Sequence, residues 1–180
     1  MKKSTAALVA LAATAVALTA AGPAGAAKVV HTMGGTVFVP NQHISQTNRF
    51  MPTVTYVRPG GYIRWEDDDR TVEPHTVMAV LASHVPNTVD EVFSCSICDL
   101  WHAHLNDPND ESSGIARKKV NVGKSGFQRE GDSLLLLNKE MSAARVNAGA
   151  GHTIHYMCAF HPWMQGIIRV TRSGKAPGSM

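Results

Sequence analysis

Four side chains of this sequence have the types and spacing that bind a metal ion. Cys158, His161 and Met164 follow one another at three-residue intervals, between two runs of β-forming residues. His75 follows a proline at the start of a third such run. One thiolate, two imidazoles and a weak axial thioether form the ligand set of mononuclear copper in electron-transfer proteins. The spacing therefore predicts a copper centre of this kind.

Each of these residues also has an ordinary structural interpretation. A lone buried cysteine usually acts as a small hydrophobic residue, and a lone methionine usually fills a core. A lone histidine is more often a surface or hydrogen-bonded residue than a ligand. Cys158 also has two candidate disulfide partners, Cys95 and Cys98. The combined spacing of the four residues favours the metal centre.

A second cluster consists of Cys95, Cys98, His102 and His104. One interpretation is a local Cys95–Cys98 disulfide, which suits an exported protein and leaves Cys158 as the single free thiol. The other is a second metal site for Zn²⁺ or Cu(I) built from all four side chains. Their spacing departs from the common paired zinc patterns. The oxidising compartment favours the disulfide.

The expectation of export comes from residues 1–26, which have the pattern of a secretory signal peptide. Lys2 and Lys3 precede an Ala/Leu/Val-rich stretch, and a small-x-small cleavage site ends at Ala26. The apolar stretch is shorter than the roughly 20 residues that a membrane span needs. We therefore expect a periplasmic or extracellular protein without a membrane span.

Charge excludes one class of partner. The formal net charge of the 180 residues is +3, and the leader carries two lysines and no acid, so 3 − 2 leaves +1. A nearly neutral chain gives no reason to expect nucleic acid as a partner. The 44% of apolar residues suffice for a core and exclude a disordered chain.

Short alternating or β-branched runs, separated by turn residues, predict an all-β sandwich or barrel. The runs that we expect to be strands are 35–39, 53–57, 62–65, 76–80, 153–157 and 166–171. Residues 66–69 resemble an acidic turn, 133–144 are ambiguous between strand and short helix, and His31 is expected in an N-terminal tail. Residues 27–172 form one domain in this prediction, with a long inserted excursion at 84–131 and a flexible tail at 173–180.

The motif Cys158-x-x-His161-Pro162-x-Met164 resembles the ligand loop of the cupredoxins, and within them the amicyanin/plastocyanin-like group. A tyrosine two residues before the cysteine and a glycine two after the methionine also match. Residues 57–65 resemble the turn and strand that lead to the family's first histidine ligand. The resemblance covers roughly 34–80 and 146–171.

The resemblance implies a Greek-key β-sandwich of about eight strands with a type 1 copper at one end. It implies His75, Cys158, His161 and Met164 as ligands, and one-electron transfer as the activity. Two positions depart from the family pattern. Thr76 stands where an asparagine usually ties the two ligand loops together, and Phe160 replaces a frequent proline. We expect a shorter anchor and a less constrained loop, which would alter the metal's surroundings.

The resemblance also implies that His161 reaches the surface within an apolar patch where partners dock. Trp163 would belong to this docking surface and electron exit, or alternatively pack against the end of the sandwich.

Three functions are compatible with these residues. The favoured one is a monomeric electron carrier between unidentified redox proteins. The alternative is a copper store or chaperone with a second Cys/His site in the excursion. Oxidase or reductase activity is disfavoured, because such enzymes usually need several His-x-His pairs and this chain has one, at 102–104.

Overall fold

The computed structural model describes residues 26–68, 73–99, 119–120, 127–136 and 141–179. Their elements are mostly short strands. The strands are β1 Lys28–Met33, β2 Thr36–Val39, β3 His43–Gln46, β4 Arg49–Met51, β5 Val54–Val57, β6 Tyr62–Asp67, β7 His75–Val80, β8 Lys119–Val120, β9 Ser133–Leu136, β10 Met141–Arg145, β11 Thr153–Met157 and β12 Gln165–Val170. A 3₁₀ turn, η1 Ala82–His84, and a short helix, α1 Val89–Phe93, follow β7.

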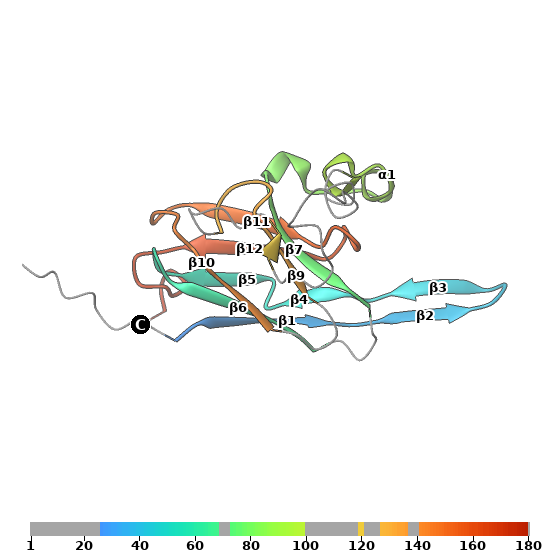
Figure 1. Ribbon diagram of the computed structural model, residues 1–180, viewed down its shortest axis with the longest axis horizontal. Helices are drawn as coiled ribbons and strands as arrows, with labels where there is room; N and C mark the ends of the chain where they lie inside the picture. Colours follow the sequence, from blue (N-terminus) through green and yellow to red (C-terminus); the bar gives the residue numbers. More distant parts are fainter. Residues whose placement is uncertain (1–25, 69–72, 100–118, 121–126, 137–140, 180) are drawn as a thin grey trace, which may run out of the picture.

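The strands form two stacked sheets and a separate hairpin (Figure 1). One sheet has the strand order β10-β6-β1-β4, and the other β5-β12-β11-β7-β9-β8. The pairs β1–β6 and β5–β12 are parallel, and the others are antiparallel. The prediction of an all-β sandwich is confirmed.

The core between the sheets is built around aromatic side chains from both layers. Trp65 of β6 lies with its ring centroid 5.2 Å from that of Phe127 and 5.8 Å from that of Tyr156 of β11. Phe50 of β4 is 4.9 Å from Tyr156. All four side chains are fully buried. Large aromatic rings contribute strongly to core stability, so this cluster fixes the two sheets relative to each other.

Strand β7 is buried along its whole length, because both of its faces are covered. Val77 and Ala79 face the inter-sheet core, whereas Met78 and Val80 belong to a second apolar cluster with Cys95 and Cys98. Residues 85–98, which include α1, thus pack on the outer face of the six-stranded sheet (Figure 1). Because apolar clusters pack on both faces of β7, the strand is held firmly, and so is His75 at its start.

The structure settles one ambiguity and corrects two expectations. Residues 133–144 contribute two strands, β9 and β10, with no helix among their described residues. His31 lies within β1, opposite Glu66 of β6, and not in a tail. Glu66 and Asp67 of the predicted acidic turn 66–69 belong to β6, where they pair with His31 and Thr32 of β1. The Asp67 carboxylate also accepts a 2.6 Å hydrogen bond from the buried Thr32 hydroxyl.

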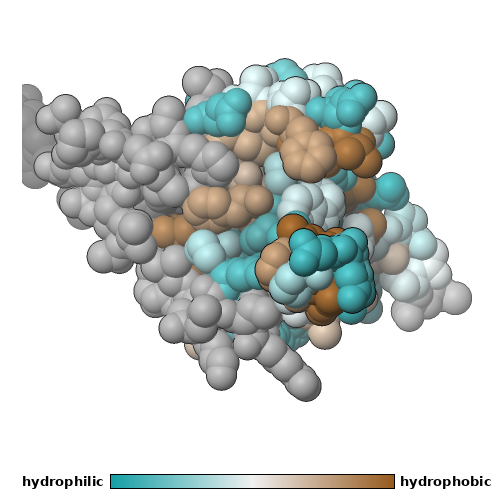
Figure 2. Space-filling model, turned by 90° about the vertical axis from the view of Figure 1, so that its right-hand side faces the viewer, coloured by the Kyte–Doolittle hydropathy of each residue, from teal (hydrophilic) through white to brown (hydrophobic). Residues whose placement is uncertain are grey.

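The β2–β3 hairpin projects from the same end of the sandwich as the loop between β11 and β12 (Figure 1). Figure 2 looks onto this end and shows hydrophobic and hydrophilic surface side by side. Phe38 and Ile44 lie opposite each other in the hairpin, and both are largely exposed. Together with the hairpin, the described residues hold twelve strands rather than about eight.

Candidate metal centre

The predicted ligands come together where three strands begin or end. His75 starts β7, Cys158 directly follows β11, and His161 and Met164 lie in the loop that leads into β12. Because β7 and β11 are antiparallel neighbours, paired from Met78–Met157 to Val80–His155, the start of one lies beside the end of the other. The sheet register therefore brings residues more than 80 positions apart to one end of the sandwich.

Three of the four predicted side chains converge closely enough to hold one ion. One metal-binding atom from each of His75, Cys158 and His161 lies within 4.8 Å of the other two. The Cys158 Sγ atom is 3.6 Å from His161 Nδ1, and the two imidazole centroids are 5.1 Å apart. All three side chains are buried. A thiol and two imidazoles at this spacing fit a soft or borderline metal ion such as copper.

Met164 belongs to the same closed loop. Its N–H donates to the His161 carbonyl at 2.7 Å, and its carbonyl accepts from the Cys158 N–H at 2.9 Å. These two bonds fold the chain around the space between the three residues. The Met164 side chain is fully buried. The loop therefore carries a thiol, an imidazole and a thioether on one short, backbone-locked turn.

Thr76 joins the two segments that carry the ligands. Its hydroxyl accepts a 2.7 Å hydrogen bond from the Ala159 N–H, and its own N–H donates to Cys158 Sγ at 3.3 Å. The shorter side chain at this position therefore still ties the two loops together. Thr76 is completely buried, so water does not compete for these bonds.

The surroundings of Cys158 favour its thiolate. Burial alone would raise the pKa of the thiol, but hydrogen bonds and charge from His161 and His75 outweigh it and lower the pKa from 9.0 to about 6. A thiolate is the form of cysteine that binds metal. The site is thus poised to present an anionic sulfur near neutral pH.

Tyr156 and Gly166 support the loop from the sheet. They are directly paired between β11 and β12, and a Cβ atom on Gly166 would lie 2.2 Å from Tyr156 Cζ. Burial raises the pKa of the Tyr156 phenol far above its ordinary value, offset only in part by Trp65. The uncharged Tyr156 ring therefore packs against the backbone at position 166, just after the ligand loop. Only glycine at that position leaves room for the ring.

The surface end of the site differs from expectation. His161 is only 7% exposed, because Trp163 and Glu73 lie against it. The Trp163 ring stands edge-on to the imidazole at 5.3 Å and is itself 37% exposed. Trp163 is thus a surface residue, as its docking interpretation requires, and it covers the imidazole that was expected to reach solvent.

Of the second predicted cluster, only Cys95 and Cys98 lie within the described residues. Cys95 and Cys98 form a disulfide with an S–S distance of 2.04 Å, and Cys158 is the free cysteine. His102 and His104 lie outside the described residues, so the four-residue site is not placed. Sulfurs bonded to each other do not serve as thiolate ligands.

Two other features of the described residues carry less chemistry. His31, Glu66 and Asp68 lie within 4.8 Å of one another, but they are partly exposed and paired among themselves and with Arg64. A surface ion-pair network accounts for them. No helix of the described residues is long and apolar enough to cross a membrane.

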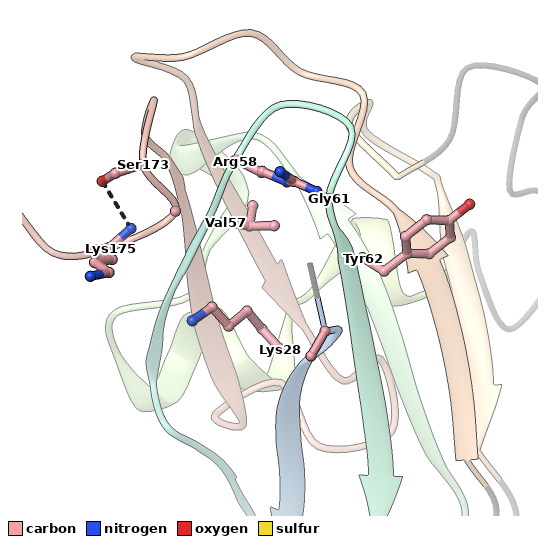
Figure 3. Close-up of a pocket in the computed structure, with 9 residues that line it drawn as sticks. Lys28, Val57, Arg58, Gly61, Tyr62, Ser173 and Lys175 are labelled. Atoms are coloured by element: carbon pink, nitrogen blue, oxygen red, sulfur yellow. Dashed lines mark hydrogen bonds between the residues drawn. The ribbon is translucent and has the colours of Figure 1, made fainter. Parts of the chain in front are cut away.

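A pocket of about 290 Å³ lies beyond the far end of β12 from the ligand loop (Figure 3). It is lined by Lys28, Arg58 and Lys175 together with Val57 and Tyr62. None of the predicted metal ligands lines it, so it is separate from the metal centre.

The strand layout, the convergence of His75, Cys158 and His161, and the position of Met164 on the same loop agree with what the sequence resemblance implied. The fold is cupredoxin-like. No family model and no curated protein matches the chain. Solved structures similar to it include auracyanin A from Chloroflexus aurantiacus, at 18% identity and a TM-score of 0.45, covering 81% of this chain and 100% of that one.

Two further similar structures are a purple cupredoxin and an amicyanin. The purple cupredoxin from Nitrosopumilus maritimus has 15% identity, a TM-score of 0.43 and coverage of 80% and 99% of the two chains. The amicyanin from Paracoccus versutus has 17% identity, a TM-score of 0.38 and coverage of 81% and 82%. At these values the cupredoxin-like assignment rests on the geometry described above.

Two further side chains, Glu73 and Gln165, lie beside the candidate metal centre. Glu73 places a carboxylate oxygen 3.5 Å from His161 Nε2, and Gln165 donates to the Pro162 carbonyl at 3.0 Å and to the Pro86 carbonyl at 2.7 Å. Gln165 therefore links the ligand loop to the excursion. No motif marks either residue, because each contact depends on the folded arrangement of distant segments.

Proposed function

We propose that this protein is an exported type 1 copper protein that carries single electrons between redox partners. The observation that carries the proposal is the convergence of His75, at the start of β7, with Cys158 and His161 within 4.8 Å. The loop that carries Cys158 and His161 also holds Met164. In this proposal the imidazoles and the thiolate are the strong ligands, and Met164 is the weak axial one. The protein acts as a monomer in the periplasm or outside the cell.

A copper ion bound by these residues would supply a one-electron couple between Cu(I) and Cu(II). The chain's part is to hold the ligands still in both oxidation states. The bonds of Thr76 to Ala159 and Cys158, and the backbone closure between Cys158 and Met164, restrain the ligand loop. A restrained donor set reorganises little when the charge of the site changes, which favours rapid electron transfer. Burial also keeps water from an open coordination position.

Electrons would leave through the His161 side of the site. His161 is the proposed ligand nearest the surface, and the exposed Trp163 ring lies against it. An aromatic ring at the surface offers a partner both apolar contact and close approach to a ligand. The partner in this proposal is a redox protein.

The competing proposal of a copper store or chaperone depends on a second set of metal-binding thiols. The Cys95–Cys98 disulfide favours the carrier, because it leaves Cys158 as the one free thiol. Metal analysis combined with voltammetry separates the two functions. The carrier predicts one copper per chain and a reversible one-electron wave. Two or more coppers per chain, passed readily to an acceptor protein, would support storage.

A further inference from the structure

Glu73 lies at the metal centre without being one of its proposed ligands. It precedes His75 by two residues, and its carboxylate oxygen Oε2 is 3.5 Å from Nε2 of His161. The same oxygen accepts a 2.9 Å hydrogen bond from the Asn48 side-chain amide. The Glu73 side chain is about one-quarter exposed and that of His161 is almost buried, so the contact sits at the rim of the site.

The two nitrogens of His161 face different partners. Nδ1 lies 3.6 Å from Cys158 Sγ, toward the centre of the site, and Nε2 faces Glu73. A metal bound at Nδ1 requires an imidazole whose proton is on Nε2. A carboxylate oxygen 3.5 Å from Nε2 attracts a proton on that nitrogen electrostatically, so it favours the tautomer and the ring orientation that metal binding at Nδ1 needs.

Asn48 holds the carboxylate in this place. The residue lies between β3 and β4 at the base of the hairpin and is only 2% exposed. Among the described residues its Oδ1 atom has no hydrogen-bond partner, so the bond to Glu73 is what its amide contributes. Burying an amide whose oxygen has no partner is unfavourable, and the hydrogen bond to Glu73 compensates its donor side.

The hairpin base is itself fixed against β1. Gly34 packs so closely that a Cβ atom there would lie 2.5 Å from the Thr47 carbonyl oxygen and 2.7 Å from Asn48 Cα. The Thr47 N–H also donates to the Gly35 carbonyl at 3.0 Å. Asn48 therefore presents its amide to Glu73 from a tightly packed backbone.

We propose that Glu73, held by Asn48, is a positioning residue for His161 that tunes the redox preference of the metal centre. This inference rests on the proposed copper function. By attracting the proton that stays on Nε2, the carboxylate makes the imidazole a stronger electron-pair donor, and its negative charge stabilises the more positive metal state. Both effects favour Cu(II) over Cu(I) and lower the reduction potential. The contact links the hairpin base to the metal centre.

The test compares the parent with Glu73→Gln, which keeps the shape and removes the charge. The preference for Cu(II) over Cu(I) should fall about tenfold, the size of effect that partners of ligating side chains commonly have. For a one-electron couple this is an upward shift of about 59 mV in the reduction potential. Asn48→Ala should move the potential in the same direction by less. The proposal would be overturned if the preference for Cu(II) over Cu(I), calculated from the reduction potential, stayed within twofold of the parent value in both variants.

Glu130→Gln is the matched control, because Glu130 also pairs with a histidine, His84, away from the metal centre. Its potential should equal that of the parent. If the reduction potential shifted equally in Glu130→Gln and Glu73→Gln, the loss of any surface charge would explain the shift. That result would overturn the positioning role of Glu73.

A second readout separates this inference from the copper function. In the Zn²⁺-loaded protein, nitrogen–proton NMR spectra report which His161 nitrogen carries the proton and how fast it exchanges. The parent should have a slowly exchanging Nε2 proton, and Glu73→Gln a rapidly exchanging one. Equal exchange in both overturns the role of Glu73, even if the copper protein is blue. If the Nε2 proton exchanges slowly in the parent and rapidly in Glu73→Gln, the positioning role of Glu73 is supported, even if the protein does not bind copper as proposed.

Discussion

The backbone N–H of Thr76 donates a hydrogen bond to the sulfur of Cys158, 3.3 Å away and 82 residues later in the chain. Together with the bond from Ala159 N–H to the Thr76 hydroxyl, it fastens the start of β7 to the ligand loop. The residue directly after His75 thus holds the segment that carries the other three proposed ligands. This link between the two ligand segments is the basis of the first prediction.

Removing the Thr76 hydroxyl should destabilise the protein. Thr76→Val keeps the side-chain shape but leaves the buried Ala159 N–H without its acceptor, which costs about 1–3 kcal/mol. Denaturant unfolding of the metal-free protein measures the loss. Thr55→Val is the control, because Thr55 is also buried and its hydroxyl has no hydrogen-bond partner among the described residues. Equal losses in the two variants would show that the Thr76 bond contributes nothing specific.

A methyl group at Gly166 should disturb the ligand loop through Tyr156. The added Cβ would overlap the buried phenol ring at 2.2 Å, and overpacking of this kind typically costs about 1–3 kcal/mol. The free energy of unfolding and the sharpness of the copper spectrum report the effect. Gly149→Ala, where the added Cβ meets nothing within 4 Å, should change stability by less than about 0.5 kcal/mol. A stable, spectroscopically normal Gly166→Ala would contradict the close packing of Tyr156 against position 166.

The ionisation of Cys158 should depend on folding. In the metal-free native protein the thiolate absorbance should appear with a midpoint near the lowered pKa of about 6, whereas the unfolded chain titrates near 9.0. Between these values the unfolded state binds more protons, so stability rises with pH over this window. The stability contributed by the lowered pKa is fully present above about 9 and is lost as the pH falls toward about 6. A native midpoint near 9.0 would mean that His75 and His161 do not act on the thiol.

Truncating Trp163 should slow electron exchange without removing the metal site. Trp163→Ala loses the exposed ring against His161, and we expect electron self-exchange between reduced and oxidised protein to fall about tenfold, equivalent to ~1.4 kcal/mol. NMR line broadening measures the rate without an identified partner. Phe93→Ala, which removes a more exposed aromatic ring from α1, should leave it unchanged. Loss of the copper colour in Trp163→Ala would make the residue structural instead.

Local patterns in the sequence sufficed for much of the site. Cys158, His161 and Met164 lie within seven residues on one loop, so their spacing alone places them together. The β-branched and alternating runs likewise marked six of the strands correctly. Their period of two is a property of each segment and needs no knowledge of its neighbours.

Contacts between distant segments could not be predicted. Glu73 and Asn48 meet only because the hairpin base folds against the segment before β7. His31 resembles a tail residue until β1 is paired with β6, and Asp67 resembles part of a turn until the Thr32 hydroxyl meets its carboxylate. A buried polar pair of this kind runs against the hydrophobic pattern from which strands are recognised.

The most direct test of the copper assignment is the visible absorption spectrum of the Cu(II)-loaded protein, compared among three forms. The parent should have an intense thiolate-to-copper charge-transfer band, because Cys158 is the proposed sulfur ligand. Cys158→Ser should lose it, and Cys95→Ser/Cys98→Ser should keep it, since those sulfurs are paired with each other. A colourless Cu(II) protein, or a band that survives Cys158→Ser, would contradict the proposed metal centre.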